Sequence, residues 1–158
     1  MPDQRKHRGP HPEDVQLFAE TEVLSLQLAC NDLSWLLSRG YASASSVKLV
    51  GDRYKLAARQ RLAVSRCACS DSDRELRLSR RVSPAETKGK PIWLDGYNVL
   101  TSIEAALGGG AILHARDGCF RDMASSMAAI ARSRKHCRRS ECWGKYTQIC
   151  RWASGLGS

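Results

Sequence analysis

The sequence has no run of about 18 apolar residues, the minimum length for a membrane-spanning helix. Its first residues, MPDQRKHRGPHPED, are polar and contain proline, and they lack the apolar core of a secretory signal peptide. These two absences predict a cytoplasmic protein with no membrane partner. The chain has 158 residues, 42% of them apolar, so it can bury the core of one ordinary domain or two small ones. Wholesale disorder is therefore excluded.

A zinc-type pair of cysteines in CxxC spacing is also absent. The cysteine count is odd and there is no secretion signal, so free thiols are predicted rather than a disulfide framework. One further combination of metal ligands can be drawn in the last part of the chain, but no second pair of cysteines supports it. Its members are His136, Cys137, Cys142 and Cys150.

Acidic residues are scarce near the end of the chain. Residues 126–158 contain seven basic residues and one acidic residue, a net charge of +6 out of the +9 of the whole chain. Only +3 remains for residues 1–125, so the basic signal for nucleic-acid binding lies mostly in the final segment.

The first half of the chain is predicted to be a helical domain over residues 13–81, after a flexible arm over residues 1–12. Leucines and valines recur near the 3.6-residue period after Thr21, which can cap the helix, and Gly40 ends it. Trp35 lies on the predicted buried side of this helix. Two shorter helices follow, over about 44–54 and 57–69, and a further helix is expected over 71–81, capped by Ser70 or Ser72.

The two short helices allow two interpretations. They form either a helix-turn-helix, with Arg59, Arg61 and Arg66 contacting a nucleic acid, or a small helical bundle whose arginines are solvated. The bundle is favoured, because helices with scattered arginines are common. The predicted core of this region is Val47, Leu49, Val50, Leu56, Leu62, Ala63 and Val64.

Residues 82–90 are rich in Ser, Pro, Gly and Lys and predict a linker. After it, Ile92, Trp93 and Leu94 predict a buried strand that stops at Asp95-Gly96. A helix over 99–107, a strand over 111–115 and a helix beginning at Arg116 should follow. This order predicts a parallel α/β layer over residues 91–124.

The glycines at 108–110 indicate a turn with positive φ, since the Lys and Ser/Thr of a phosphate-binding loop are absent. His114, inside the predicted strand, is interpreted as a packed or edge histidine rather than a metal ligand.

Active residues of parallel α/β sheets collect at the carboxyl ends of strands, where the motif LDGYNVL places Asp95. Gly96 allows a tight turn, and Asn98 can reach back with its amide or cap the following helix. A carboxylate at this position, joined by others, could hold Mg²⁺ or Mn²⁺ and activate water for phosphodiester hydrolysis.

The motif LDGYNVL resembles the first strand of PIN-like domains, especially the NYN subgroup, in which the Asp is a metal ligand. Two longer stretches resemble the domain-of-unknown-function 434 family of prokaryotes. The first is DLSWLLSRGYASASSVKLVGDRYKLAARQRLAVSRCACSD, and the second runs from LDGYNVL to CFRD. The resemblance covers about residues 8–124. It implies that the protein is a relative of metal-dependent ribonucleases with a helical bundle followed by an incomplete PIN-like parallel α/β layer.

The resemblance carries the metal-binding and catalytic role to Asp95, with Asn98 as the polar residue beside it. Glu104, Asp117 and Asp122 are the further acids that could complete the metal site, and each could equally be a surface or capping acid.

Residues 125–158 are rich in Arg, Cys, Ser and Trp and depart from the family pattern. We interpret them as the product of a frameshift near Ser125, which sequencing the gene would test. The later strands and acids would then be missing, so we expect an inactive, truncated nuclease relative. The alternatives are a non-catalytic module that binds RNA or another nucleic acid through the helical half, and an interaction domain with no nucleic-acid role.

Overall fold

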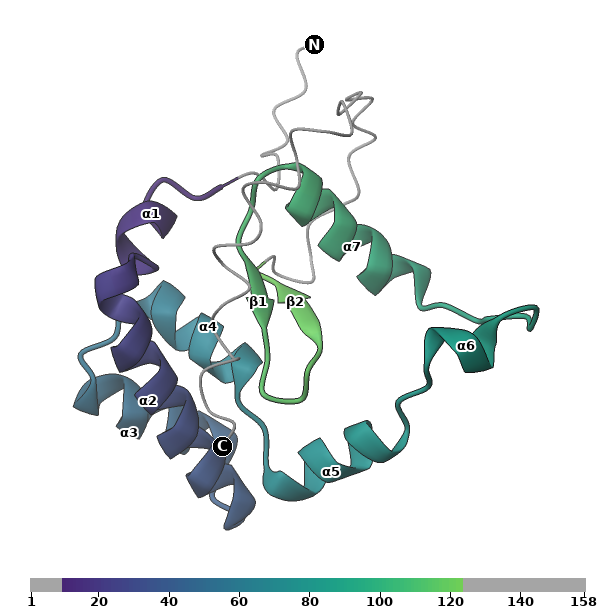
Figure 1. Ribbon diagram of the computed structural model, residues 1–158. Helices are drawn as coiled ribbons and strands as arrows, with labels where there is room; N and C mark the ends of the chain where they lie inside the picture. Colours follow the sequence, from purple (N-terminus) through teal and green to yellow (C-terminus); the bar gives the residue numbers. More distant parts are fainter. Residues whose placement is uncertain (1–9, 124–158) are drawn as a thin grey trace.

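The computed structural model describes residues 10–123 of the chain. Most of this part is helical, and its strands form one small antiparallel sheet (Figure 1). No helix among these residues has the length and apolar character needed to cross a membrane. The elements, in chain order, are α1 (Asp14–Leu17), α2 (Glu20–Ser38), α3 (Ser43–Arg53), α4 (Ala58–Cys67), α5 (Asp71–Ser79), α6 (Pro84–Thr87), α7 (Gly96–Leu107), β1 (Ile112–His114) and β2 (Phe120–Asp122).

The predicted helices of the first half are confirmed, with small changes at their ends. Gly40 has a φ of +79° and follows the C-cap of α2, where its N–H donates to the carbonyl of Leu37. The N–H of Tyr41 donates to the carbonyl of Leu36, which completes the paired end bonds of a Schellman motif. Thr21 does not cap α2, because the N-cap is Ala19, one residue before the helix begins.

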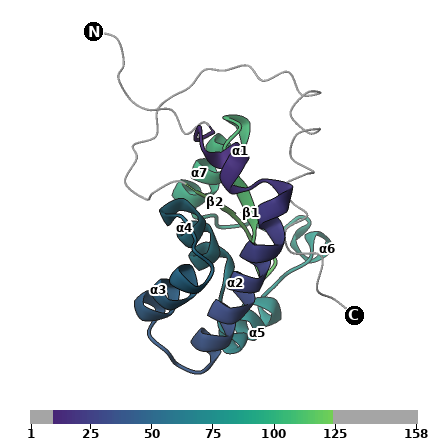
Figure 2. The ribbon, with the colours of Figure 1, turned by 90° about the vertical axis from the view of Figure 1, so that its left-hand side faces the viewer.

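The core lies where α2, α3 and α4 meet the hairpin, and Figure 2 shows α2 running alongside the other two helices. Leu26, Leu33 and Val64 are almost fully buried there together with Leu113 of β1. Burying each such side chain contributes about 1.5–3 kcal/mol relative to leaving it exposed. The helical half and the hairpin therefore share one core.

Three residues that were predicted to be buried are exposed instead. Leu49 is 60% exposed and Leu62 is 38% exposed, and neither belongs to the core that α2, α3 and α4 share. Trp35 is 52% exposed, and the guanidinium of Arg39 stacks over its ring at 3.6 Å. The cation covers one face of the indole, so this tryptophan is stabilised without entering the core.

The predicted strand over Ile92, Trp93 and Leu94 is wrong. These residues form no strand, and they are 60%, 96% and 69% exposed. A strand needs a partner for its backbone groups, and within residues 10–123 β1 pairs with β2 only. The predicted parallel order is therefore replaced by an antiparallel hairpin.

The predicted helix beginning at Arg116 is also wrong, because the chain turns back there. Gly118 has a φ of +77°, and the carboxylate of Asp117 accepts the N–H of Cys119 at 3.1 Å. An Asp-Gly pair that adopts this geometry ends the helical path and favours a turn. Phe120 then pairs with His114, and their rings stack with centroids 4.9 Å apart. His114 is thus a half-buried, packed histidine, as predicted.

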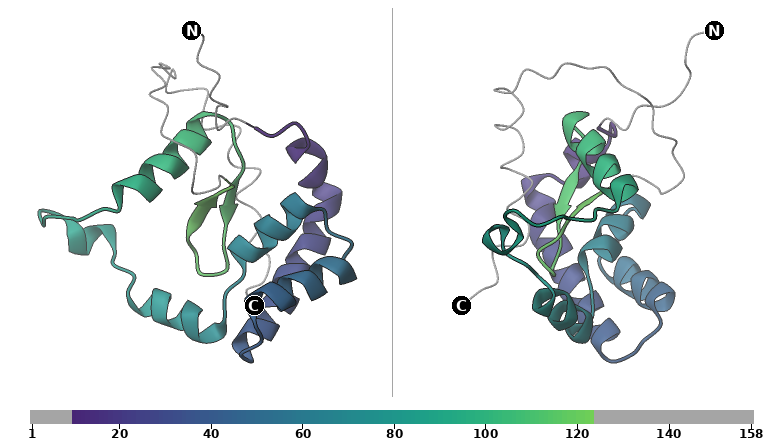
Figure 3. Two further views of the ribbon diagram at one scale, coloured as in Figure 1. Left: turned by 180° about the vertical axis from the view of Figure 1, so that it is seen from behind. Right: turned by 90° about the vertical axis from the view of Figure 1, so that its right-hand side faces the viewer.

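The hairpin lies between two helical layers, as the views in Figures 1 and 3 agree. On one side, Leu113 and Met123 join the core with α2 and α4. On the other side, Ser102 of α7 donates a hydrogen bond to Asp122 of β2 at 2.8 Å. The architecture is therefore a helical bundle joined to a small helix–sheet–helix arrangement, and the predicted turn at the glycines is confirmed by a φ of +78° at Gly109.

Candidate functional site

Asp95 and Asn98 form a helix cap at the start of α7. The carboxylate of Asp95, the N-cap residue, accepts the backbone N–H of Asn98 at 3.4 Å. The side-chain amide of Asn98 donates to the other carboxylate oxygen at 2.7 Å. Both residues are exposed. The spacing Asp-Gly-x-Asn is thus used to satisfy the free N–H groups of a helix end.

Asp122 is a buried acid that connects three elements. Its side chain lies on β2, receives the hydrogen bond from Ser102 of α7, and approaches the guanidinium of Arg66 on α4 at 3.7 Å. Arg66 also donates to the backbone carbonyl of Asp122 at 2.6 Å. These contacts hold the sheet between α4 and α7.

Asp117 is the most enclosed carboxylate of the turn, with a side chain that is 1% exposed. Arg121 donates to both of its oxygens, at 2.8 and 2.5 Å, and Arg77 of α5 donates at 2.7 Å. The hydrogen bonds from Arg121, and then those from Cys119 and Arg77, hold the pKa of Asp117 well below its ordinary value. Asp117 therefore stays charged and fastens α5 to the hairpin.

The predicted metal ligands are not brought together. Glu104 lies half-buried on α7, Asp95 is exposed at the start of that helix, and Asp117 and Asp122 are bound to arginines on other elements. Across residues 10–123, no group of three or more His, Cys, Asp or Glu side chains could hold a metal ion. These residues do not fit Mg²⁺ or Mn²⁺, which need several converging oxygens. The metal and catalytic role of Asp95 stays a prediction from its motif.

The three arginines predicted to contact nucleic acid are held by groups of the protein. Arg59 pairs with Asp14, which raises the pKa of the Arg59 guanidinium. Arg61 donates to Asp52 at 2.8 Å and to the carbonyl of Leu56 at the same distance, while Arg66 bonds to Asp122. Each arginine joins two elements or closes a turn, and a nucleic-acid role for them stays a prediction.

The charge of the described part is nearly balanced. Residues 10–123 contain 15 basic and 14 acidic residues, so most of the net +9 belongs to residues 1–9 and 124–158. A nucleic-acid interface usually presents an excess of positive charge on one face. The near balance over residues 10–123 gives no such general excess.

The thiols at Cys30, Cys67, Cys69 and Cys119 are free, as predicted. Cys67 of α4 lies in the core with Cys30 of α2 packed against it, and the thiol of Cys30 donates to the backbone carbonyl of Val64 at 4.0 Å. The nearby Cys67 thiol and burial raise the pKa of Cys30, while the Cys30 thiol lowers the pKa of Cys67. The alternative metal ligands at residues 136–150 lie outside the described residues.

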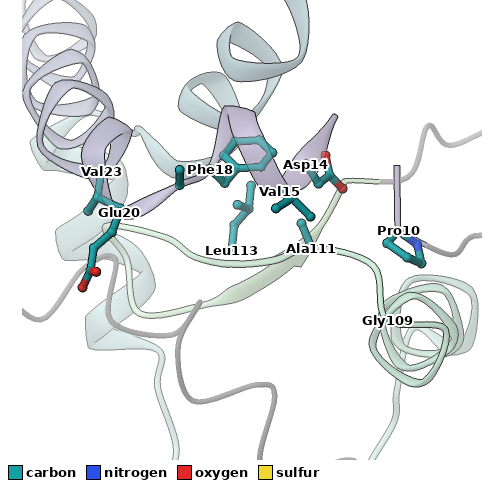
Figure 4. Close-up of a pocket in the computed structure, with 10 residues that line it drawn as sticks. Pro10, Asp14, Val15, Phe18, Glu20, Val23, Gly109, Ala111 and Leu113 are labelled. Atoms are coloured by element: carbon teal, nitrogen blue, oxygen red, sulfur yellow. The ribbon is translucent and has the colours of Figure 1, made fainter. Parts of the chain in front are cut away.

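A cavity of about 360 Å³ opens where α1 and the start of α2 face β1 (Figure 4). In that view Ala111 and Leu113 rise from the hairpin toward Val15 and Phe18. Two acids, Asp14 and Glu20, line the cavity, and Asp14 is bound to Arg59. No predicted site residue lines it. The full lining is Pro10, Asp14, Val15, Phe18, Ala19, Glu20, Val23, Gly109, Ala111 and Leu113.

Several large apolar side chains between Ile92 and Leu107 are exposed, and the sequence predictions did not identify them. We call the exposed side chains of α7 the outer stripe: Val99, Leu100, Ile103 and Leu107. Their spacing of three or four residues places them on one side of the helix. The side that faces the hairpin carries Thr101 and Ala105 instead, which are 6% and 4% exposed. The spacing was visible in the sequence, but it did not indicate which side of α7 would face the hairpin.

Over residues 10–123, these features define an arrangement of helices and one hairpin, with a capped helix where a metal-binding strand end was expected. Comparison with known proteins adds a family context. Residues 25–80 match the family model described as "Protein of unknown function (DUF434)", and residues 84–150 match "Domain of unknown function (DUF5616)". The first match agrees with the predicted resemblance. The second extends to residue 150, beyond residue 124, where the resemblance was expected to end.

An uncharacterized protein of Methanocaldococcus jannaschii is 36% identical over 101 residues. The alignment covers 63% of this chain and 48% of the relative, so the chain spans about half of the relative's length. No solved structure matches the chain. The family matches and this relative together support a family of proteins whose function is unknown.

Proposed function

We propose that the chain is a non-catalytic protein-interaction domain whose second half is a degenerate relative of the PIN-like nuclease fold. The observation that carries this proposal is the direction of α7, whose outer stripe faces solvent. Monomeric proteins seldom expose contiguous apolar patches larger than a few hundred Å², and larger ones mark contact surfaces. Ile92, Trp93 and Leu94, which precede the helix, are exposed as well.

The proposed relationship to PIN-like nucleases is supported by the motif LDGYNVL. The second half of the chain departs from that fold in two ways. The apolar residues before Asp95 form no strand, and β1 pairs antiparallel with β2. The end of a parallel strand, which would direct Asp95 toward other acids, is therefore not formed.

The absence of catalysis is proposed from the way the carboxylates are used. Asp95 caps α7, Asp117 is surrounded by guanidinium groups, and Asp122 lies between Ser102 and Arg66. A guanidinium that pairs with a carboxylate competes with a cation for the same oxygens. One exposed carboxylate rarely holds Mg²⁺ without further protein ligands.

The experiment is an assay of single-stranded RNA cleavage with Mn²⁺, comparing the chain with Asp95→Asn. We expect no cleavage that depends on Asp95. Binding of the same RNA should be undetectable at physiological salt, because the arginines of α4 are held by Asp14, Asp52 and Asp122. Cleavage that Asp95→Asn abolishes would overturn the proposal and restore the nuclease hypothesis. Metal-independent RNA binding that weakens steeply with salt would instead favour a nucleic-acid-binding module.

A further inference from the structure

Arginine side chains gather around the turn that joins β1 to β2. Figure 1 shows this turn pointing toward α5, and Arg77 of α5 donates to Asp117 within it. Nη1 of Arg81, which follows α5, lies 3.8 Å from the position that a Cβ on Gly118 would take. The hairpin supplies two further arginines beside Asp117. We call this group the arginine cluster, and its members are Arg77, Arg81, Arg116 and Arg121.

The arginine cluster carries an excess of positive charge. Among residues 10–123, the carboxylates that pair with it are Asp71 and Asp117. Four guanidinium groups and two carboxylates leave a net charge of +2. Arg81 pairs with neither acid and is exposed. Two positive charges in excess are the charge that a doubly negative oxyanion would neutralise.

Three of the four guanidinium groups are already held in place. The enclosed carboxylate of Asp117 accepts from Arg77 at 2.7 Å and from Arg121 at 2.5 and 2.8 Å. Arg116 donates to the backbone carbonyl of Cys69 at 3.0 Å and also pairs with an acid of α5. Groups that are fixed before a ligand arrives lose less conformational entropy when it binds. The arrangement therefore favours binding of an anion over a set of loose surface arginines.

Two members of the cluster retain donors that face water. Arg77 uses only Nη1 for Asp117, so its Nε and Nη2 have no partner within residues 10–123. Its side chain is 46% exposed. The guanidinium of Arg81 donates to none of the described residues. Guanidinium groups present pairs of N–H donors whose spacing matches two oxygens of a phosphate.

We propose that the arginine cluster binds a phosphate group, either as inorganic phosphate or as part of a small phosphomonoester. The phosphate oxygens accept from Arg81 and from the remaining donors of Arg77. Arg116 and Arg121 add positive charge from the hairpin side. This inference goes beyond the proposed function and does not depend on it, because it uses no residue of the outer stripe.

The small size of the cluster favours a single phosphate over a nucleic-acid backbone. A polymer of phosphates is bound along a groove or face with repeated cations. Apart from the four arginines and their two acids, residues 10–123 carry 11 basic and 12 acidic residues. Residues 1–9 and 124–158 contain ten basic and two acidic residues, so they offer few carboxylates that could neutralise the cluster in place of a ligand.

The test is phosphorus nuclear magnetic resonance of inorganic phosphate and of methyl phosphate, each titrated with the full chain at constant ionic strength. We expect the signal of at least one compound to shift and broaden. Arg81→Gln should raise the dissociation constant about ten-fold or more, because a charged donor to the phosphate is lost. Tighter binding of methyl phosphate would identify a phosphomonoester as the ligand, and tighter binding of inorganic phosphate would identify the free ion.

Arg81→Gln removes no ion pair within residues 10–123, so circular dichroism should show an unchanged fold. Arg53→Gln on α3 is the matched control, because the Arg53 side chain is 71% exposed and pairs with Asp32 rather than with the hairpin. It should leave the dissociation constant unchanged.

An unchanged phosphorus signal at millimolar concentrations of both compounds would overturn the proposal. So would equal binding by Arg81→Gln and the unmodified chain. Single-stranded RNA that binds the cluster more tightly than either compound, and loses that binding in Arg81→Gln, would overturn the assignment to a small ligand. The proposed function is judged separately, by the cleavage assay on Asp95→Asn.

Discussion

Replacing Asp117 by Asn should remove a large part of the stability of the fold. The carboxylate is almost completely enclosed and receives hydrogen bonds from Arg77, Arg121 and the N–H of Cys119. Asn has nearly the same volume, but its NH₂ group would oppose the N–H donors of a guanidinium. The substitution therefore removes the negative charge and leaves two cations facing each other.

The expected loss of free energy of unfolding depends on how far the two arginines that pair with Asp117 are exposed. Breaking a buried ion pair by removing one partner costs about 3–5 kcal/mol. The side chains of Arg121 and Arg77 are 28% and 46% exposed, so water can partly compensate their charges. We therefore expect the lower end, about 3 kcal/mol, which is a large share of the 5–15 kcal/mol typical of a domain.

Urea unfolding followed by far-ultraviolet circular dichroism measures this free energy. Arg77→Met is the matched control, because it removes one partly exposed ion pair and should cost only about 1 kcal/mol. If Asp117→Asn lowers the free energy of unfolding by less than about 1 kcal/mol, the ion pairs of Asp117 do not act as buried ones, since exposed ion pairs contribute no more than that.

The same carboxylate predicts a direction for the effect of pH. The pKa of Asp117 is lower in the folded protein than the ordinary value of about 3.9 in an unfolded chain. The contribution of the ionised Asp117 carboxylate to the free energy of unfolding is therefore complete above about pH 4 and is lost as the pH falls below that value. The difference in unfolding free energy between the unmodified chain and Asp117→Asn should accordingly shrink on acidification. A difference that stays constant from neutral pH to pH values well below about 4 would contradict this assignment.

Three smaller effects follow from local geometry. Ser70→Ala should cost about 1 kcal/mol in urea unfolding, because the Ser70 hydroxyl caps α5; a neutral change would contradict the cap. Gly40→Ala should cost about 1–2 kcal/mol, because Gly40 has positive φ, and an unchanged midpoint would argue against that conformation. Among the described thiols, Cys119 should react first with iodoacetamide, and buried Cys67 and Cys69 only after unfolding; mass spectrometry of labelled peptides would reveal the opposite order.

Local signals in the sequence predicted the helical half well. Gly40 and Ser70 act through bonds within a few residues of themselves, so their roles as helix end and helix cap depend little on the rest of the fold. The cap at the start of α7 is equally local, but the sequence pattern assigned capping to Asn98 and a metal role to Asp95, whereas Asp95 is the N-cap.

Predictions that depended on distant partners were less successful. A run such as Ile92-Trp93-Leu94 is apolar whether or not a neighbouring strand pairs with it, so the sequence could not show that the pairing is absent. The Asp117-Gly118 pair favours a turn, and the prediction of a helix beginning at Arg116 did not take this preference into account. Trp35 was assigned to the core from periodicity, although Arg39 one turn later could cover its ring.

The candidate site shows the same division. The sequence allowed Asn98 either to reach back with its amide or to cap the following helix, and in the structure that amide donates to Asp95. Which acids converge depends on the strand order and on the arginines that compete for each carboxylate. Asp117 and Asp122 are each held by an arginine on another element, and that pairing is not encoded in local spacing.

The central claim is that α7 turns its large apolar side chains outward and packs its small ones on the hairpin. Urea unfolding of Ala105→Lys and Leu100→Lys in dilute solution tests it most directly, because the same substitution is made on opposite sides of one helix. Ala105 is 4% exposed and should lose about 3 kcal/mol or more on receiving a buried charge, whereas Leu100→Lys should lose less than about 1 kcal/mol. A larger loss for Leu100→Lys than for Ala105→Lys would show that α7 faces the other way.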